Sequence, residues 1–380
     1  MVETVAPSGP VGEALKILTA CGLGEPRLWI RRQADLSDGE QFRAALARAV
    51  GQALADPRRP PIICDEFTAL LHRRLACCVS HNLRKLISRT GLTLVLASAH
   101  LDLVEDLQPD THVSLGGARA LVTARQPRDR PPSIRRRVHV EPGQVSDYRR
   151  FAPMHYRHRD VLGFVDKVFL LSEGAAREPL GIAVLAHAPI ELSLRHQATE
   201  GRFVRNGARL NRELRILRRL VMHPDVRGCG LGHWFVRQVL PQSGVRFVEC
   251  LAAMGAVNPV FEKAGMTRIG RCPPPRGRLK LLQRMQSLEL DPFSPDFIER
   301  IRRYPRVRRL VESTIKHWHY ATRGSPKPNL RRRAPDMLAA TFRQLLGDPP
   351  VYFLWDRLGE FPRGKPADLV RPNPLPSRDR

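Results

Sequence analysis

A glycine-rich turn near the middle of the chain carries the strongest chemical signal in the sequence. The apolar run Leu217–Met222 leads through a proline turn into an Arg-x-x-Gly-x-Gly motif, and a helical pattern follows from Leu231 to Leu240. Glycine lets a ligand approach the backbone closely, and the first N–H groups of a helix have no partner within it, so a pyrophosphate group fits such a turn. The sequence therefore predicts a phosphate-binding turn formed by Arg227, Gly228, Cys229, Gly230, Leu231 and Gly232.

Two adjacent carboxylates end an apolar run in the first third of the chain. The run Ile62–Cys64 leads directly into Asp65 and Glu66, and a second run, Leu92–Ala97, ends shortly before His100. At the end of a strand, one carboxylate can hold Mg²⁺, the other can polarise a water molecule, and an imidazole can reach a phosphate. A solvated carboxylate pair and a structural histidine are the alternatives to this chemistry.

Upstream of these carboxylates, a polar turn enters an amphipathic helical pattern. The turn consists of Ser37, Asp38, Gly39, Glu40 and Gln41. A serine hydroxyl and backbone N–H groups at a helix N-terminus suit a phosphate. A serine followed three residues later by a glutamate is also typical of a capping box, which only closes the end of a helix. Both interpretations are open from the sequence.

The elements that must position these residues fall into segments of different composition. Residues 1–125 are rich in Leu and Ala, residues 126–133 form a Pro/Arg linker, and residues 134–290 alternate strand-like runs with helical patterns. Residues 291–380 combine helical patterns and arginine clusters with a Pro-rich end. This order predicts an α/β protein with a basic helical tail. The strand-like runs of the third segment are Lys167–Leu171, Gly181–Ala186, Ile216–Met222 and Phe247–Ala252.

The charge balance and the cysteine pattern limit the classes of partner and site. The 63 Lys and Arg residues exceed the 37 Asp and Glu residues, which gives a formal net charge of +26 and attracts nucleic acid, ribonucleoprotein or acidic protein surfaces. The seven cysteines are scattered without a CxxC pair, so neither a disulfide framework nor a metal site is expected. No apolar run reaches the roughly 18 residues that a membrane span needs. The sequence therefore predicts a cytoplasmic protein without a membrane partner.

The polar turn, the paired carboxylates and the histidine, in this order, resemble the second half of an ABC-type ATPase. The resemblance implies a signature motif in the turn, a Walker B acid at Asp65, a catalytic glutamate at Glu66 and a switch histidine at His100. The residues that it relates to a nucleotide are Ser37, Gly39, Glu40, Gln41, Asp65, Glu66 and His100.

This segment departs from the ATPase pattern at three points. Residues 1–35 contain no GxxxxGK[ST] sequence, the P-loop that cradles phosphates. Asp38 stands where the signature has glycine, and His72 stands where aspartate follows the Walker B motif. We therefore expect a degenerate ATP-binding segment without ATPase activity in this chain alone. ATP and Mg²⁺ are expected to bind only if a partner or a longer chain supplies the P-loop.

The phosphate-binding turn resembles the acyl-CoA loop of the GNAT family of N-acetyltransferases. The segment Asn258–Met266, which follows the run Phe247–Ala252, resembles the second motif of that family, and the resemblance covers residues 134–271. It implies a mixed α/β domain that binds acetyl-CoA or another acyl-CoA, with the pantetheine arm on a strand that splays from its neighbour. The implied coenzyme-binding residues are Leu220, Val221, Met222, Arg227, Gly228, Cys229, Gly230, Leu231, Gly232 and Asn258.

Acyl transfer also needs a base for the amine and a proton donor for the leaving thiolate. The family commonly has a tyrosine as donor where this chain has Phe261, which cannot donate. Glu213 and Glu249 are candidate bases, and ordinary ion-paired carboxylates are the alternative interpretation. The catalytic acid must therefore come from elsewhere, or the thiolate leaves unaided.

With both segments in one chain, the sequence resembles proteins in which an ABC ATPase is fused to a predicted acetyltransferase. The two resemblances imply an acyl-CoA-dependent N-acyltransferase whose acceptor is nucleic acid or protein, because a chain of charge +26 repels small cationic amines. His155, Tyr156 and a basic insertion over residues 189–211 are expected at the acceptor groove. The alternative is a non-catalytic scaffold that binds nucleic acid or a partner protein. A homodimer, or a partner that supplies a P-loop, is compatible with both interpretations.

Overall fold

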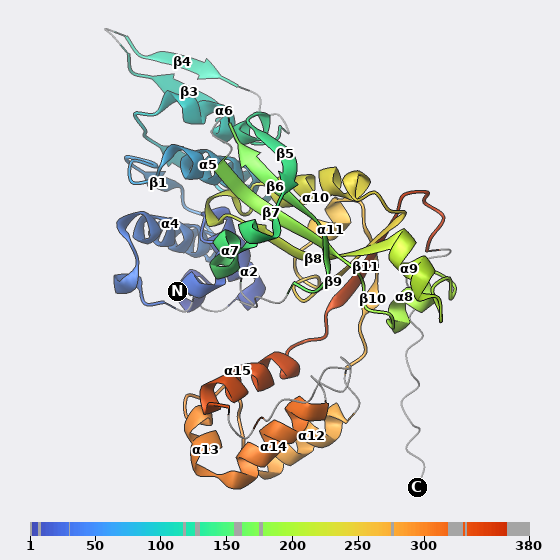
Figure 1. Cartoon of the computed structure of the whole chain (residues 1–380). Coiled ribbons are helices and arrows are strands. Elements are labelled where there is room, and N and C mark those ends of the chain that lie inside the picture. The colour runs from blue at the N-terminus through green and yellow to red at the C-terminus, as the bar shows by residue number, and fades with distance from the viewer. Residues whose placement is uncertain are drawn as a thin grey trace. The chain divides into compact units, whose positions relative to one another are not determined.

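The computed structural model describes residues 2–6, 9–29, 31–116, 119–125, 130–155, 162–174, 178–274, 277–317, 330 and 333–362. The chain divides into two compact units, whose elements are labelled in Figure 1. The main unit contains the chain up to residue 251, residues 255–270 and the chain from residue 352. The helical unit contains residues 252–254 and 271–351. The large mixed sheet of the main unit confirms the predicted α/β class.

The N-terminal block, the part of the main unit within residues 2–125, is built around three helices. Leu18 from α2 (Val11–Ala20), Ala47 from α4 (Asp38–Ala55) and Val79 from α5 (Arg73–Thr90) share one buried hydrophobic core. A parallel pair, β1 (Ile62–Cys64) and β2 (Leu94–Leu96), lies beside these helices, and β3 (Thr111–Ser114) forms an antiparallel hairpin with β4 (Leu121–Ala124). The shorter helical elements of the block are α1 (Val2–Val5), α3 (Pro26–Trp29), η1 (Gln33–Asp35), η2 (Leu101–Leu103) and α6 (Val104–Leu107).

The seven-stranded sheet forms the centre of the main unit. Its strand order is β10-β11-β9-β8-β7-β6-β5, with antiparallel pairs from β5 to β8 and a parallel pair between β8 and β9. The predicted strand-like runs all lie within strands. The strands are β5 (Val138–Gly143), β6 (Val165–Glu173), β7 (Glu178–Ala186), β8 (Leu214–Met222), β9 (Phe247–Ala252), β10 (Thr267–Arg271) and β11 (Val351–Asp356).

Two helices cover opposite faces of this sheet next to β8. Val221 packs with Tyr148 and Phe151 of α7 (Tyr148–Phe151), whereas a Cβ at Gly232 of α10 (Leu231–Gln242) would lie 3.7 Å from Met222. Successive side chains of a strand point to opposite faces, so α7 and α10 lie on different sides. The remaining helical elements of this region are η3 (Ser133–Arg136), η4 (Val145–Asp147), η5 (Ala152–Met154), α8 (Ser193–Ala198), α9 (Gly207–Glu213), η6 (Pro224–Val226) and α11 (Val260–Lys263).

The predicted linker does not separate two independent domains. Residues 126–129 lie outside the described residues, but Ser133 donates its amide to Asp106 Oδ1 at 2.7 Å and its hydroxyl to Asp106 Oδ2 at 2.6 Å. Asp106 is buried in the N-terminal block. The segments predicted as 1–125 and 134–290 therefore belong to one compact unit.

The C-terminal segment also differs from the prediction of a tail that begins at residue 291. Four helices share a separate core in which Met285, Ile301, Leu310 and Phe342 are buried. After them the chain returns to the sheet as β11, because Val351–Asp356 is an apolar run that can be buried between β10 and β9. The Pro-rich end beyond residue 362 lies outside the described residues. The four helices are α12 (Arg278–Ser287), α13 (Phe297–Arg303), α14 (Pro305–Ile315) and α15 (Pro335–Leu346).

Candidate functional site

The predicted phosphate-binding turn lies where the two parallel strands of the sheet separate. The ladder between β8 and β9 joins Leu214–Ile216 to Phe247–Glu249, and no further pair follows in these fully described strands. From Leu217 onward β8 therefore has one edge bonded to β7 and one edge without a ladder partner. The turn follows directly, and α10 begins at the residue after Gly230. The φ of Gly230 is 90°, a backbone conformation that residues other than glycine rarely adopt.

Arg227, predicted to face a pyrophosphate, instead fastens the turn to the protein. Its guanidinium donates to Met222 O at 3.0 Å, to Gly24 O at 3.3 Å and to Met154 O at 2.8 Å. Three N–H groups of Arg227 thus donate to protein carbonyls, whereas the sequence predicted that this side chain faces a ligand. Met154 O also brings the predicted acceptor-groove residue His155, its neighbour in sequence, next to this region. Tyr156 lies outside the described residues.

The first half of the turn packs against the N-terminal block. A Cβ at Gly228 would lie 3.0 Å from both Asn82 of α5 and Thr19 of α2. Buried Cys229 contacts buried Cys78 of α5, and that contact lowers the pKa of Cys229. We call the region where this turn meets α2 and α5 the turn–block junction. It leaves Gly230, Leu231 and Gly232 as the part of the predicted turn that starts α10.

Asp225 links two histidines at the same junction. Its Oδ2 lies 3.1 Å from His223 Nδ1 and 3.1 Å from His72 Nε2, the first residue before α5. Burial raises the pKa of Asp225, but the hydrogen bonds and charges of His223 and His72 outweigh it and hold the pKa below its ordinary value. The turn thereby contacts the residue where the ATPase pattern has aspartate. The described residues contain no group of three or more side chains able to hold a metal ion.

Four cations act on His233 near the start of α10. Burial, followed by the charges of Lys263, Arg237, Lys85 and Arg135, lowers the pKa of His233 in the first turn of the helix. The Arg135 guanidinium lies 5.2 Å from the centre of the Trp234 ring. An anion at this helix start is favoured by the local charge and by the helix dipole. The sequence does not reveal this group of cations, because its members are spread over residues 85–263 and no local spacing connects them.

Both candidate bases are held in ion pairs. Glu249 is fully buried and accepts from Arg195 Nε at 2.8 Å, from Arg195 Nη2 at 2.7 Å and from Tyr352 Oη at 2.9 Å. Glu213 accepts from Arg202 Nε at 2.8 Å. These contacts are those that the ion-paired interpretation predicts for the two carboxylates. Arg195 and Arg202 are correspondingly not free charges of the predicted basic insertion.

The second predicted coenzyme motif serves local packing. Asn258 Oδ1 accepts from the amide of Val260 at 3.2 Å, which places it at the start of α11. Phe261 is buried with its ring centre 5.4 Å from that of Phe353. A phenol missed by sequence analysis lies on the other face of β8, where Tyr148 Oη accepts from Arg219 Nε at 3.2 Å.

The signature-like turn forms a capping box. The Ser37 amide donates to Glu40 Oε2 at 3.0 Å, and Gln41 Nε2 donates to Leu36 O at 2.9 Å. Gly39 packs on the loop after β1, since a Cβ there would lie 3.0 Å from Leu70 O. Ser37 and Glu40 thus close their own helix, as the capping alternative predicts, and Gln41 bonds to the residue before them.

The carboxylates and the histidine gather at one end of the β1–β2 pair. Ala97 donates its amide to Cys64 O at 3.0 Å, and Phe67 donates its amide to Ala97 O at 2.8 Å, so the chain segments after both strands run side by side. Asp65 and Glu66 are exposed, and Glu66 adopts a φ of 48°. The parallel pairing therefore brings Asp65, Glu66 and His100 to the same end of the two-stranded sheet.

An exposed apolar patch lies on the same two strands. Ile63 and Val95 are register partners and are 76% and 52% exposed. Leu70 and Leu101, from the segments that follow the strands, are 60% and 70% exposed. Neighbouring exposed apolar side chains such as Ile63 and Val95 are typical of a surface that another element covers.

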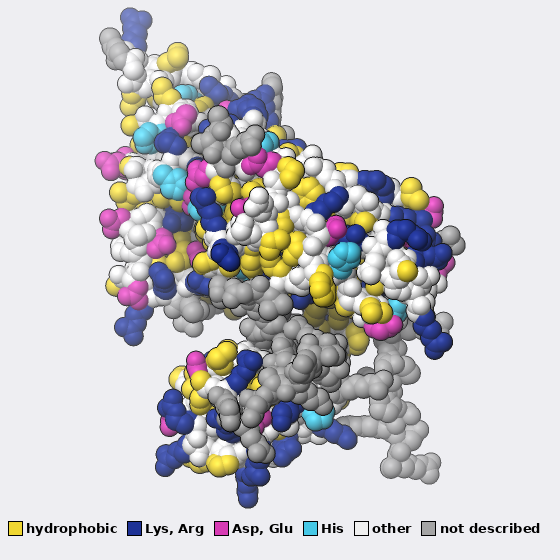
Figure 2. Space-filling view, in the orientation of Figure 1, with side chains coloured by type: hydrophobic (Ala, Val, Ile, Leu, Met, Phe, Trp, Pro, Cys, Tyr) yellow, Lys and Arg dark blue, Asp and Glu magenta, His cyan; other side chains and the backbone are white. Residues whose placement is uncertain are grey.

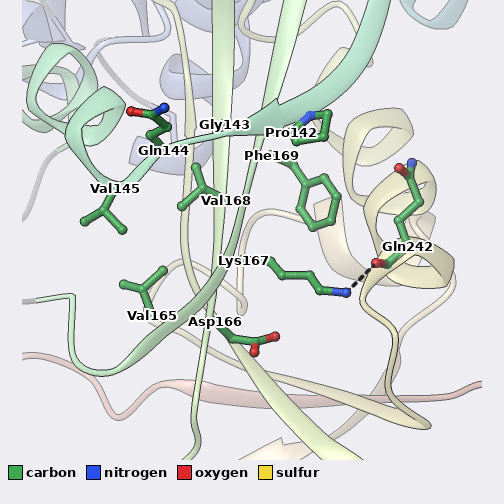
Figure 3. Close-up of a pocket in the computed structure, with 10 residues that line it drawn as sticks. All are labelled: Pro142, Gly143, Gln144, Val145, Val165, Asp166, Lys167, Val168, Phe169 and Gln242. Atoms are coloured by element: carbon green, nitrogen blue, oxygen red, sulfur yellow. Dashed lines mark hydrogen bonds between the residues drawn. The ribbon is translucent and has the colours of Figure 1, made fainter.

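A hollow of about 600 Å³ lies at the other end of β8, away from the turn (Figure 3). It is lined by the end of β5, the start of β6 and Gln242 at the end of α10, about 18 Å along the helix from the turn. Lys167 Nζ donates to Gln242 O at 3.5 Å, and Asp166 pairs with Arg215 at 3.0 Å. Because both charged side chains are engaged, this hollow is not assigned to the coenzyme.

The comparisons with known proteins concern the ATPase-like part. Over 115 residues, 30% of the chain, the sequence is 36% identical to the lipoprotein-releasing system ATP-binding protein LolD of Nitrobacter hamburgensis and covers 46% of that protein. It is 35% identical to LolD of Nitrobacter winogradskyi over the same length, again 46% of the relative. No family model matches the chain.

This similarity supports an ABC ATPase-like segment in the chain. The chain spans about half the length of the curated relatives that it matches. In the part of the chain that the structure describes, no helix combines the length and apolar character that crossing a membrane requires.

Proposed function

We propose that this chain is an acyl-CoA-dependent N-acyltransferase whose coenzyme phosphates bind at the start of α10. The observation that carries this proposal is the separation of β8 from β9 immediately before a glycine turn and a helix N-terminus. Beyond Ile216 the β8 backbone has no ladder to β9, and an extended amide chain such as pantetheine would pair with a strand edge of this kind. Two carbonyls of this stretch accept from side chains, Met222 O from Arg227 and Arg218 O from Arg219. Lys85, Arg135, Arg237 and Lys263 supply the positive charge that the prediction gave to Arg227.

The chemistry is direct acyl transfer to an amine. A bound acyl-CoA would supply a thioester carbonyl, at which the C–N bond forms and the C–S bond breaks. With Glu213 and Glu249 in ion pairs, we assign the amine proton to solvent water. We assign Tyr148 as the acid that donates a proton to the leaving thiolate. Its phenol is held at β8 by Arg219.

Coenzyme A binding tests this proposal. Gly230→Asp places a side chain and a negative charge at the start of α10, so we expect at least a tenfold loss of affinity in calorimetry. Gly277→Asp is the matched control, because Gly277 also precedes a helix and has a φ of 83°, compared with 90° at Gly230. Equal coenzyme A affinity in wild type and Gly230→Asp contradicts the proposal.

A second proposal concerns the nucleotide-related end of the β1–β2 pair. We propose that ATP and Mg²⁺ bind there only when a polypeptide with a P-loop covers the apolar patch of Ile63, Leu70, Val95 and Leu101. The similarity to 46% of an ATP-binding protein supports it, as do the solvent-facing Asp65 and Glu66. Residues 1–35 themselves contain no P-loop sequence.

The rival function is a scaffold without catalysis. It is favoured by Arg227, whose donors hold the protein together, and by Phe261, which cannot protonate a thiolate. The calorimetry decides between the two, since a scaffold that binds no coenzyme A gives no heat in wild type.

A further inference from the structure

The helical unit presents arginines that no acidic side chain among the described residues pairs with. Helices α13 and α14 contain six arginines and two glutamates. Glu299 pairs with Arg302 at 2.5 Å, and Glu312 pairs with Arg308 at 2.8 Å. Arg300 donates to Glu289 O at 2.6 Å and to Leu288 O at 2.9 Å.

Besides Arg300, three of these six arginines have no acidic partner among the described residues. They are Arg303 at the end of α13 and Arg306 and Arg309 in the first turns of α14. Arg306 and Arg309 are three residues apart and lie on one side of their helix. Dark-blue side chains lie over the helices of this unit in Figure 2. Neighbouring positive charges repel one another, and a bound anion relieves this repulsion, so the group favours anion binding.

An aromatic ring lies within this arginine group. Tyr304 is 48% exposed, and the Arg303 guanidinium lies 5.9 Å from its ring centre. Tyr304, Arg306 and Arg309 line a hollow of about 440 Å³ on the surface of the unit. That volume lies in the range of pockets that hold small molecules, and so suits one nucleotide.

We propose that this hollow binds single-stranded nucleic acid, with phosphates on Arg303, Arg306 and Arg309 and one base on Tyr304. Guanidinium groups match the geometry of phosphate oxygens and bind them in pairs. An exposed ring beside them points to an unpaired base, because a base inside a duplex cannot stack on a side chain. The proposal is independent of the coenzyme site, since none of these residues belongs to it.

The phosphate part is tested on the full chain by fluorescence anisotropy with labelled 12-nucleotide single-stranded RNA and DNA. If three phosphates are contacted, log affinity falls against log salt with a slope of about 2, at about 0.7 per phosphate for single strands. Arg306→Ala with Arg309→Ala should reduce that slope by about 1.4. The matched control is Lys280→Ala with Arg284→Ala, which removes the same charge from exposed positions on α12.

The base part is tested at Tyr304. Tyr304→Ala should weaken oligonucleotide binding by about 5- to 100-fold, whereas Tyr304→Phe keeps the ring and should bind as wild type does. An abasic sugar–phosphate oligomer should bind Tyr304→Ala and wild type equally.

Three outcomes overturn the proposal. The first is no binding at about 50 mM salt. The second is an equal loss of slope in the Lys280/Arg284 control. The third is competition by polyglutamate as strong as by unlabelled oligonucleotide, which would show that the arginines bind an acidic polypeptide. Coenzyme A affinity measured on the same variants keeps this result separate from the acyltransferase proposal.

Discussion

At the scale of single residues, the most constrained group is the buried ion pair of Arg195 and Glu249. Besides Glu249, the guanidinium donates to Pro189 O at 2.8 Å and to Ile190 O at 3.0 Å, and Tyr352 donates to the carboxylate. Burial raises the pKa of Tyr352 well above its usual value, so the phenol stays protonated as a donor. The group joins α8, β9 and β11, and it lies where β8 and β9 separate.

Removing one member of this group should be costly. Arg195→Met leaves the Glu249 carboxylate buried without its partner, and we expect a loss of about 3–5 kcal/mol in the free energy of unfolding. Urea denaturation measures this loss. Arg212→Met, at a largely exposed side chain, is the control and should change stability by less than about 0.5 kcal/mol. A small effect at Arg195 would show that the pair is not a structural anchor.

Sequence analysis identified Glu249 but not its role. Its partners lie 54 and 103 residues away along the chain, so no spacing connects them. The same limit applies to Arg227, whose carbonyl acceptors include one that is 203 residues distant. Residue type and local motif predict which groups are available for chemistry. Only the contacts in the folded protein show which of these groups already have a hydrogen-bond or ion-pair partner.

At the scale of elements, helix α5 connects the ATPase-like motifs to the turn before α10. Its first residue, Arg73, bonds to Asp102 in the segment after His100, while Asn82 donates to Arg227 O at 3.5 Å. The residue before the helix, His72, contacts Asp225. The helix therefore contacts both the nucleotide-related end and the turn–block junction.

This junction should weaken in acid. The pKa of Asp225 is lower in the folded protein than in the unfolded chain, so the unfolded chain binds more protons as the pH falls. The contribution of Asp225 to stability is present above its unfolded pKa of about 3.9 and is lost as the pH falls through the folded pKa. Below about pH 4 the urea midpoint of wild type should fall more steeply than that of Asp225→Asn. Parallel pH profiles of the two proteins would contradict this assignment.

Element positions were largely readable from the sequence, whereas their partners were not. The runs Ile62–Cys64 and Phe247–Ala252 coincide with β1 and β9, and the helical pattern from Leu231 matches the start of α10. β11 was missed because its apolar run follows helical, arginine-rich sequence. Its place between β10 and β9 depends on contacts with strands 80 to 100 residues earlier in the sequence, which periodicity does not encode.

At the scale of the whole molecule, the ATPase-like segment carries only part of the residues that ATP hydrolysis uses. Glu66 and His100 lie at one end of the β1–β2 pair, and residues 1–35 contain no P-loop sequence. We therefore expect this chain alone to release no phosphate from ATP above background in a coupled assay. Sustained release that disappears in Glu66→Gln would contradict that expectation.

The two ends of the helical unit lie side by side: the Cys272 amide donates to Pro350 O at 2.9 Å, and the Arg278 guanidinium donates to Leu346 O at 2.9 Å and to Gly347 O at 3.3 Å. A short glycine–serine turn could therefore replace everything between them, because closing so small a gap costs little chain entropy. β10 and β11 are neighbours in the sheet although the four helices lie between them in sequence, as expected of a single insertion. Bundles exchanged at this position would carry their own binding preference with them. Under the proposal that the bundle binds nucleic acid, the choice of target would then be transplantable apart from the turn that starts α10.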